Sequence, residues 1–178
     1  LFYAIEDKEL LLHYQPIVDL ESGNLTGVEA LVRWHHPKFG MLLPEKFIPL
    51  AKETGLIVDL SKWVLKQACK QVRMWHEAGF KSLSMTINIS AIEFDQAKLI
   101  GHIEGVLAET GMPPELLELD IAESVLMQDA EMSVKILQSL KEIGVRIAID
   151  DFGIGYSSMS YLKHFPIDIL KIDRSLTH

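Results

Sequence analysis

Two adjacent carboxylates follow a short apolar run late in the chain. Residues 147–149, Ile-Ala-Ile, precede Asp150 and Asp151, and Gly153 and Gly155 come directly after them. Neighbouring anions at the end of a buried strand repel each other and resist desolvation. A divalent cation would offset this repulsion, and glycines let the backbone turn sharply towards a ligand. The alternative is a strand-to-helix turn in which Asp151 caps the helix.

Polar side chains recur at the ends of five expected strands. They are Glu29 and Arg33, Asn88, Asp120 and Glu123, Asp150 and Asp151, and Lys171 and Asp173. In a barrel the carboxyl ends of the strands meet at one face, so these side chains are expected to converge there. The set that suits Mg²⁺ or Mn²⁺ contains only oxygen donors: Glu29, Asn88, Asp120, Asp150 and Asp151. A two-metal centre of this kind activates water for in-line displacement at phosphorus.

Other side chains are suited to substrate contacts. Lys171 supplies a positive charge that can orient the attacking water or neutralise the transition state. Arg33 alternates in phase with Glu29 and Leu31, so it can share their face and grip a phosphate. Gln15, on the first expected strand, can hydrogen-bond a base or a phosphate.

Each of these residues also has a purely structural interpretation. Glu29 can be a surface residue, Asn88 can cap the next helix, and Lys171 can extend from the barrel wall into solvent. Glu123 is out of phase with Asp120, which favours a loop-holding role over metal ligation. A zinc site at residues 35–36, His-His, lacks further His or Cys partners at ligand spacing, which favours a loop role.

Hydrophobic patterning predicts strands that alternate with helices. Strands are expected at 10–20 and 25–34, joined as a hairpin, and at 82–90, 116–124, 145–150 and 168–173. Helices are expected at 43–55, 56–79, about 95–110, about 129–143, and near 157–165. This alternation predicts an α/β fold with parallel pairing, either a doubly wound sheet or a (β/α)8 barrel. Phosphate-binding glycine motifs are absent and polar strand ends recur, so the barrel is favoured.

Composition excludes several classes of function. The 178 residues carry a net charge of −8, which argues against DNA or RNA held on a basic surface. No apolar run reaches the length of a membrane span, so no membrane contact is expected. The single cysteine, Cys69, lies in a helical pattern and fits a reducing, cytoplasmic compartment. The six expected strands fall short of the eight of a barrel, so the chain is expected to be one domain that is incomplete at its C-terminal end.

Five segments, in order, resemble the EAL domain family. They are "YQPIVDLESGNLTGVEALVRW", "INIS", "LELDIAES", "IDDFGIGYSS" and "LKID", and the signature tripeptide is residues 29–31, Glu-Ala-Leu. The resemblance covers the whole chain, residues 1–178. It implies a modified TIM barrel with an antiparallel first strand, and a bacterial phosphodiesterase that linearises cyclic di-GMP to pGpG.

The resemblance also implies a role for each candidate residue. Metal ligands are expected at Glu29, Asn88, Asp120, Asp150 and Asp151. A water-positioning lysine is expected at Lys171, a loop-steadying glutamate at Glu123, and ligand contacts at Gln15, Leu31 and Arg33. Fusion to sensory or GGDEF domains and formation of a homodimer are further expectations.

Three positions depart from the family pattern. Asp120 stands where Glu is usual, Ala122 where Thr is usual, and Ile154 where Thr is usual. The shorter Asp120 requires the metal to move or a water to bridge, or else weakens the site. A later glutamate and glutamine of the family are absent from this chain. Two functions remain open: a phosphodiesterase, and a degenerate EAL domain that binds cyclic di-GMP without cutting it.

Overall fold

The computed structural model describes residues 4–5, 9–94, 98–154 and 162–176. It begins with a hairpin of β1 (Leu10–Val18) and β2 (Leu25–His36), which pair antiparallel. In the turn, Asp19 accepts hydrogen bonds from the backbone N–H and the hydroxyl of Ser22, and Gly23 has a φ of 69°. The expected antiparallel first strand is therefore confirmed.

Four parallel strands continue the sheet from β2. They are β4 (Ser84–Ile89), β5 (Leu117–Ala122), β6 (Arg146–Phe152) and β7 (Ile169–Ile172). The strand order is β1-β2-β4-β5-β6-β7. A seventh strand, β3 (Gly40–Leu42), pairs antiparallel with the end of β2. The expected count of six strands missed β3, because three residues are too few for an alternating pattern.

Helices connect the parallel strands. They are α2 (Pro44–Glu53), α3 (Ile57–Glu77), α4 (Ala91–Phe94), α5 (Leu99–Thr110), α6 (Glu123–Leu126) and α7 (Ala130–Ile143), with 3₁₀ turns η1 (Pro114–Leu116) and η2 (Arg174–Leu176). The expected strand 116–124 ends at Ala122, because Glu123 begins α6. The expected helix at about 95–110 begins at Leu99, after the separate α4. Most of the helix expected near 157–165 lies outside the described residues.

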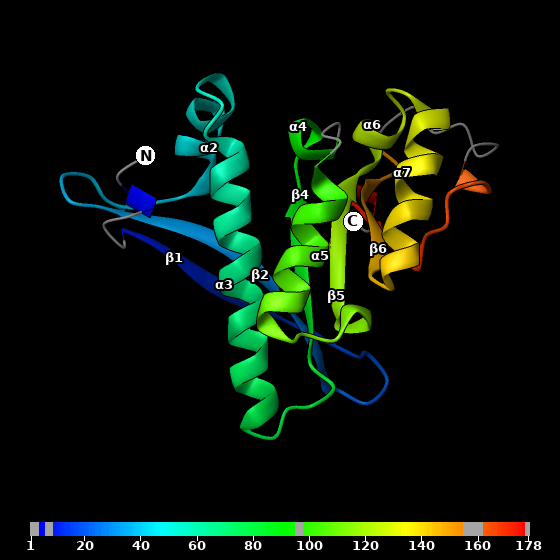
Figure 1. Cartoon of the computed structure of the whole chain (residues 1–178), viewed down its shortest axis with the longest axis horizontal. Helices are drawn as coiled ribbons and strands as arrows, with labels where there is room; N and C mark the ends of the chain where they lie inside the picture. Colours follow the sequence, from blue (N-terminus) through cyan, green and yellow to red (C-terminus); the bar gives the residue numbers. More distant parts are fainter. Residues whose placement is uncertain (1–3, 6–8, 95–97, 155–161, 177–178) are drawn as a thin grey trace.

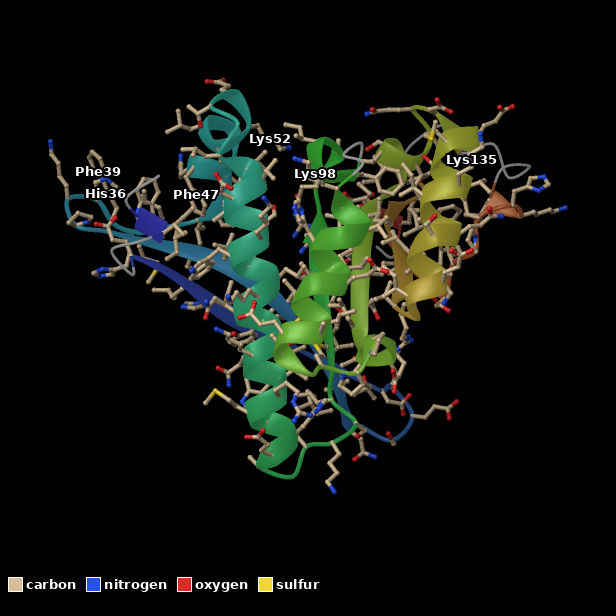
Figure 2. The ribbon with its side chains drawn as sticks, viewed as in Figure 1. His36, Phe39, Phe47, Lys52, Lys98 and Lys135 are labelled. Atoms are coloured by element: carbon tan, nitrogen blue, oxygen red, sulfur yellow. The ribbon has the colours of Figure 1, made fainter. Side chains whose placement is uncertain are left out.

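The main helices form one layer on one face of the sheet. Helix α3 packs against α5, and α5 against α7 (Figure 1). Their apolar side chains meet the helix-facing rows of three strands, residues 85, 87 and 89, residues 117, 119 and 121, and residues 147 and 149. A smaller core under α2 contains Trp34 and Phe47, whose rings contact edge to face; Phe47 is labelled in Figure 2.

The opposite face of the parallel strands carries polar side chains, among them Thr86, Glu118 and Asp120, which are buried. A doubly wound sheet has helices on both faces, whereas a barrel has them only outside. The one-sided helix layer is therefore the arrangement of a barrel wall. In the described part of the chain, no helix is both long enough and apolar enough to cross a membrane.

Candidate functional site

Strand register brings the predicted site residues to one edge of the sheet. Gln15 lies directly opposite Glu29 in the β1–β2 pair, and Asn88 lies beside Asp120 in the β4–β5 pair. Asp150 lies beside Ala122 in the β5–β6 pair, two residues beyond the position of Asp120 along the strands. Since adjacent residues in register share a face of a sheet, these side chains share the polar face.

Glu29 and Asn88 form the first contact of the site. The side-chain amide of Asn88 donates to Glu29 Oε1 at 2.7 Å, across the β2–β4 pair. Asn88 therefore does not cap α4; instead Glu93 accepts hydrogen bonds from both the backbone N–H and the hydroxyl of Ser90. An amide that donates through its nitrogen leaves its carbonyl oxygen directed elsewhere, where it can bind a cation.

Lys171 forms the second contact, between two buried carboxylates. Its Nζ lies 2.6 Å from Asp120 Oδ2 and 3.1 Å from Glu118 Oε1. Thr86 donates its hydroxyl to the same Glu118 oxygen at 3.0 Å. Burial lowers the pKa of Lys171, but the hydrogen bonds and charges of its two acidic partners outweigh burial, and its pKa lies above the usual value. Lys171 therefore stays protonated at neutral pH. A nucleophilic lysine must first lose its proton, so this argues against a nucleophilic role for Lys171.

Asp120 is the most desolvated acid of the candidate set, and its side chain is 2% exposed. The pKa of Asp120 is raised to about 7, chiefly by burial. The hydrogen bond and charge of Lys171 oppose this rise, whereas the charges of Asp150 and Glu118 contribute to it. Asp120 Oδ1 is buried and has no hydrogen-bond partner among the described residues. A buried carboxylate oxygen without a partner is costly, and such an oxygen is suited to a cation.

Asp150 and Asp151 end β6, as the sequence predicts. Asp151 has a φ of 56°, a left-handed conformation that a residue other than glycine seldom adopts. Burial raises the pKa of Asp151, and the charges of Asp150 and Asp173 raise it further. Strain and repulsion therefore coincide at the predicted ligand pair, and a cation there would relieve the repulsion.

Glu123 does not join the polar face of the strands. It begins α6, and its Oε2 accepts the backbone N–H of Gly153 at 3.0 Å. Gly153 has a φ of 97°, so it occupies a conformation that favours glycine. Glu123 thereby holds the segment that follows Asp151, in agreement with the predicted loop-holding interaction.

Leu31 and Arg33 lie on β2 in phase with Glu29, and all three are half-buried. Arg33 donates one guanidinium N–H to the carbonyl of Val32 at 2.9 Å. The residues therefore lie where the sequence predicts, one and two alternations beyond Glu29 towards the end of the strand.

The predicted metal ligands have suitable donor atoms. Glu29, Asn88 and Asp120 each use one side-chain atom to hold a neighbour, and each has an oxygen outside the hydrogen bonds described above. Within the described residues, no three His, Cys, Asp or Glu side chains lie close enough together to enclose a metal ion. The donor atoms themselves, carboxylate and amide oxygens, are of the kind that a hard divalent cation prefers.

Sequence reasoning missed Glu118, although a signal was present. In the segment "LELDIA", Glu118 alternates in phase with Asp120, so both acids had to share the polar face of β5. The loop role expected for residues 35–36 is wrong, because both lie in β2 and pair with β3; His36 Nδ1 accepts the backbone N–H of Lys38 in the turn that follows. Cys69 is buried, and burial raises its pKa to about 12.

Comparison with known proteins identifies the family. The EAL domain model matches residues 1–178. The chain is 46% identical over 171 residues to the bifunctional diguanylate cyclase/cyclic di-GMP phosphodiesterase MucR of Pseudomonas aeruginosa, covering 96% of this chain and 25% of MucR. It is 49% identical to the signaling protein YkoW of Bacillus subtilis, covering 97% of this chain and 21% of YkoW. The chain thus spans about a quarter of the length of these relatives.

Solved structures agree with this assignment. The PaMucR phosphodiesterase in complex with c-di-GMP superimposes with a TM-score of 0.95 and 45% identity, over 99% of this chain and 73% of that one. The EAL enzyme Bd1971, in its cGMP-bound form, gives a TM-score of 0.87 and 33% identity, over 98% and 49% of the two chains. The fold is therefore that of the modified TIM barrel of EAL domains. This chain belongs to the EAL domain family.

Proposed function

We propose that residues 1–178 are part of one EAL domain that hydrolyses a phosphodiester bond of cyclic di-GMP to give linear pGpG. The observation that carries the proposal is the pairing of Glu29 with Asn88 and of Asp120 with Lys171 on the polar face of the sheet, beside Asp150. The relatives MucR and NbdA of Pseudomonas aeruginosa, both described as cyclic di-GMP phosphodiesterases, support it.

Mg²⁺ or Mn²⁺ would be held by Glu29, Asn88, Asp120, Asp150 and Asp151. When bound, such ions lower the pKa of a water molecule and neutralise charge on the phosphate. The chain's own residues position these groups. Asn88 holds the Glu29 carboxylate by a hydrogen bond, and Lys171 holds that of Asp120, so each acid enters the reaction in a fixed orientation.

The remaining residues bind the substrate or position the loop. Lys171 keeps its proton and supplies a positive charge beside the reacting phosphate. Glu123 fixes the backbone after Asp151 through Gly153. Gln15, Leu31 and Arg33 are the substrate-binding residues, and the free donors of Arg33 are suited to a phosphate oxygen.

A second function, a cyclic di-GMP receptor that does not cut, is favoured by Asp120. This acid is one methylene shorter than Glu, and Lys171 already occupies one of its oxygens at 2.6 Å. A site in which the cation cannot reach Asp120 would keep the nucleotide contacts and lose turnover. In both cases we propose a cytoplasmic signalling domain that is joined to sensory or GGDEF domains and forms homodimers.

Hydrolysis of cyclic di-GMP by the chain, and by the longer protein that contains it, tests the proposal. We expect pGpG to form with Mg²⁺ or Mn²⁺ and not with a chelator. Glu29→Ala is expected to reduce turnover by about 100-fold or more, whereas Glu131→Ala, an exposed acid on α7, is expected to leave it unchanged.

Nucleotide binding without turnover in any metal would support the receptor instead. If neither protein binds cyclic di-GMP, both functions are wrong.

A further inference from the structure

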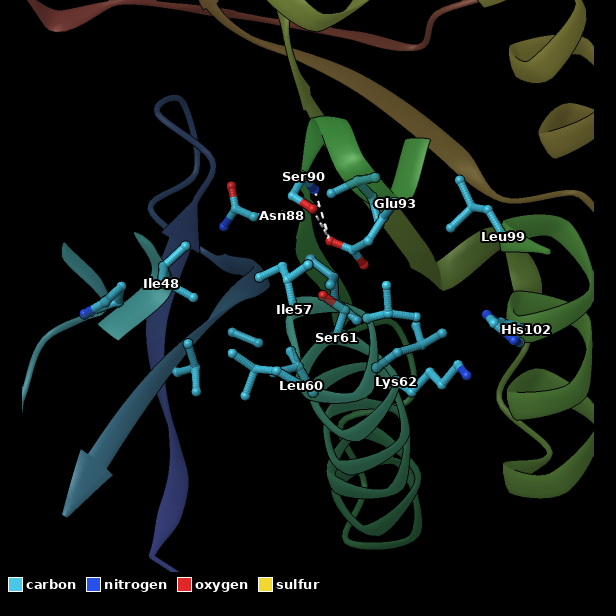
Figure 3. A pocket seen from close by; sticks show the side chains of 18 of the residues that line it. Ile48, Ile57, Leu60, Ser61, Lys62, Asn88, Ser90, Glu93, Leu99 and His102 are labelled. Carbon is cyan, nitrogen blue, oxygen red and sulfur yellow. Dashed lines mark hydrogen bonds between the residues drawn. The ribbon is translucent and has the colours of Figure 1, made fainter. Parts of the chain in front are cut away.

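A second concave site lies beside the candidate active site, where residues of β2 and β4 meet the helix layer. It is a cavity of about 340 Å³ between α2, the start of α3, and the α4–α5 segment (Figure 3). Its walls are mainly aliphatic and include Ile48, Ile57, Leu60 and Leu99. Asn88 also lines it, so the cavity adjoins the candidate active site. Apolar pockets of this size with a few polar groups are typical of small-molecule sites.

The mouth of this cavity is basic, in a chain with a net charge of −8. Lys52, Lys62 and His102 line it, and Lys98 precedes α5. Figure 2 shows Lys52 on the α2–α3 side and Lys98 on the α4–α5 side of the same end of the helix layer. Burial lowers the pKa of His102, and the charges of Lys62 and Lys98 lower it further, so the positive charge at the mouth comes from the lysines.

The basic groups are available to a ligand. Among the described residues, Lys52, Lys62 and Lys98 have no carboxylate within ion-pair distance. The acid in the cavity wall, Glu93, is already engaged by the backbone N–H and the hydroxyl of Ser90. An incoming anion therefore meets lysines without a competing partner, next to an apolar interior.

We propose that this cavity binds a small amphiphilic carboxylate, whose aliphatic chain enters the cavity while its head contacts Lys62 and its basic neighbours. At the roughly 30 Å³ that a water-sized group occupies, 340 Å³ holds about eleven such groups. That space suits a linear acid of about eight to ten carbons. The cavity shares Leu31 and Asn88 with the site proposed for cyclic di-GMP, but the carboxylate would occupy the space beyond them, and its binding is tested without the nucleotide.

Calorimetric titration with hexanoate, octanoate and decanoate tests the chain-length requirement. Each buried methylene contributes about 0.8 kcal/mol, so we expect affinity to rise about fourfold per carbon until the cavity is full. Octylammonium, with the same chain and the opposite charge, is expected to bind at least about tenfold more weakly than octanoate. Absence of saturable binding of any acid, or equal binding of octylammonium, would overturn the proposal.

Two variants locate the ligand. Ser61 lies on α3 in the cavity wall, and Ser61→Phe fills the space without disturbing the buried core. It is expected to abolish octanoate binding. Lys62→Glu is expected to weaken binding about five- to tenfold, whereas Lys135→Glu makes the same charge change on α7 (Figure 2) and should have no effect.

If Ser61→Phe does not fold, as judged by its circular dichroism, the two lysine variants still decide the question. Equal losses in Lys62→Glu and Lys135→Glu would mean that overall charge governs binding, and would overturn the proposed site.

Discussion

Removal of the cation between Asp120 and Glu118 gives the sharpest test of the buried polar face. Lys171→Met keeps an unbranched side chain of similar length and deletes only the charge and its hydrogen bonds. The two acids then remain on the inner face of β5 with side chains 2% and 5% exposed, and without their cation. The effect on stability follows from that burial.

The expected loss is about 3 kcal/mol in the free energy of unfolding. Removing one partner of a buried ion pair costs about 3–5 kcal/mol, because the remaining charge is left uncompensated. Three effects place the value at the lower end: Lys171 is itself 25% exposed, Thr86 keeps its hydrogen bond to Glu118, and Asp120, whose pKa is already raised to about 7, can take up a proton once the lysine is gone. The methionine also recovers part of the packing of the lysine stem.

Urea denaturation in the presence of a chelator measures this loss without interference from metal. Lys66→Met is the matched control, because Lys66 lies 2.7 Å from Glu109, nearly the same distance as Lys171 from Asp120. The Lys66 pair is exposed, with side chains 39% and 50% accessible, so its removal is expected to be undetectable.

Equal losses in the two variants would show that burial does not govern the strength of these pairs. A loss below about 1 kcal/mol in Lys171→Met would refute the assignment of a desolvated triad.

Three further predictions concern separate parts of the chain. Burial raises the pKa of Asp168, but hydrogen bonds from a lysine and from a backbone N–H outweigh it, and the net pKa is lowered. The stability that ionised Asp168 contributes is complete above its unfolded pKa of about 3.9 and is lost as pH falls through its folded pKa. In Asp168→Asn, Tm should therefore decline less than in the parent chain between about pH 4 and pH 2. Asp151→Asn keeps a residue type that tolerates positive φ and removes repulsion with Asp150, so metal-free Tm should stay equal or rise while hydrolysis is lost; a clear fall in Tm would contradict this. Glu93→Ala removes two hydrogen bonds to Ser90 and should destabilise the chain by about 2 kcal/mol in urea denaturation, whereas Glu104→Ala on α5 should have no effect.

The positions of the site residues could be predicted because they follow from strand periodicity. Asn88 and Asp120 each stand near the end of an apolar strand, and Glu29 stands at the end of the part of β2 that pairs with β4, so parallel pairing brings them together. The one-sided helix layer follows from the same pattern, since each strand has a continuous apolar row for the helices to cover. Local information thus sufficed for the fold class and for placing the candidate residues on one face of the sheet.

The partners of these residues could not be predicted, because they depend on contacts between distant segments. Lys171 and Glu118 are 53 positions apart in the sequence, and only the order β5-β6-β7 brings them together. Likewise, Asn88 has the residue type of a helix cap, and its actual bond to Glu29 depends on the β2–β4 pairing. Which of several possible partners a polar side chain bonds is decided by the tertiary structure and not by the local sequence.

The contacts of Lys171 explain how the chain accommodates Asp at position 120, where Glu is usual. An acid one methylene shorter would lose its ion pair if the lysine could not move. Lys171 has a flexible stem, however, and its Nζ lies 2.6 Å from Asp120 while it still contacts Glu118. The lysine can therefore follow the acid, and Oδ2 is satisfied at either length. What the missing methylene changes is the position of Oδ1, which is buried and has no hydrogen-bond partner in the described part of the chain. Under the proposed function, the position of this oxygen distinguishes hydrolysis of cyclic di-GMP from binding without cleavage. Asp120→Glu moves that oxygen outward while Lys171 adjusts, so it is the substitution that tests the choice between the two functions.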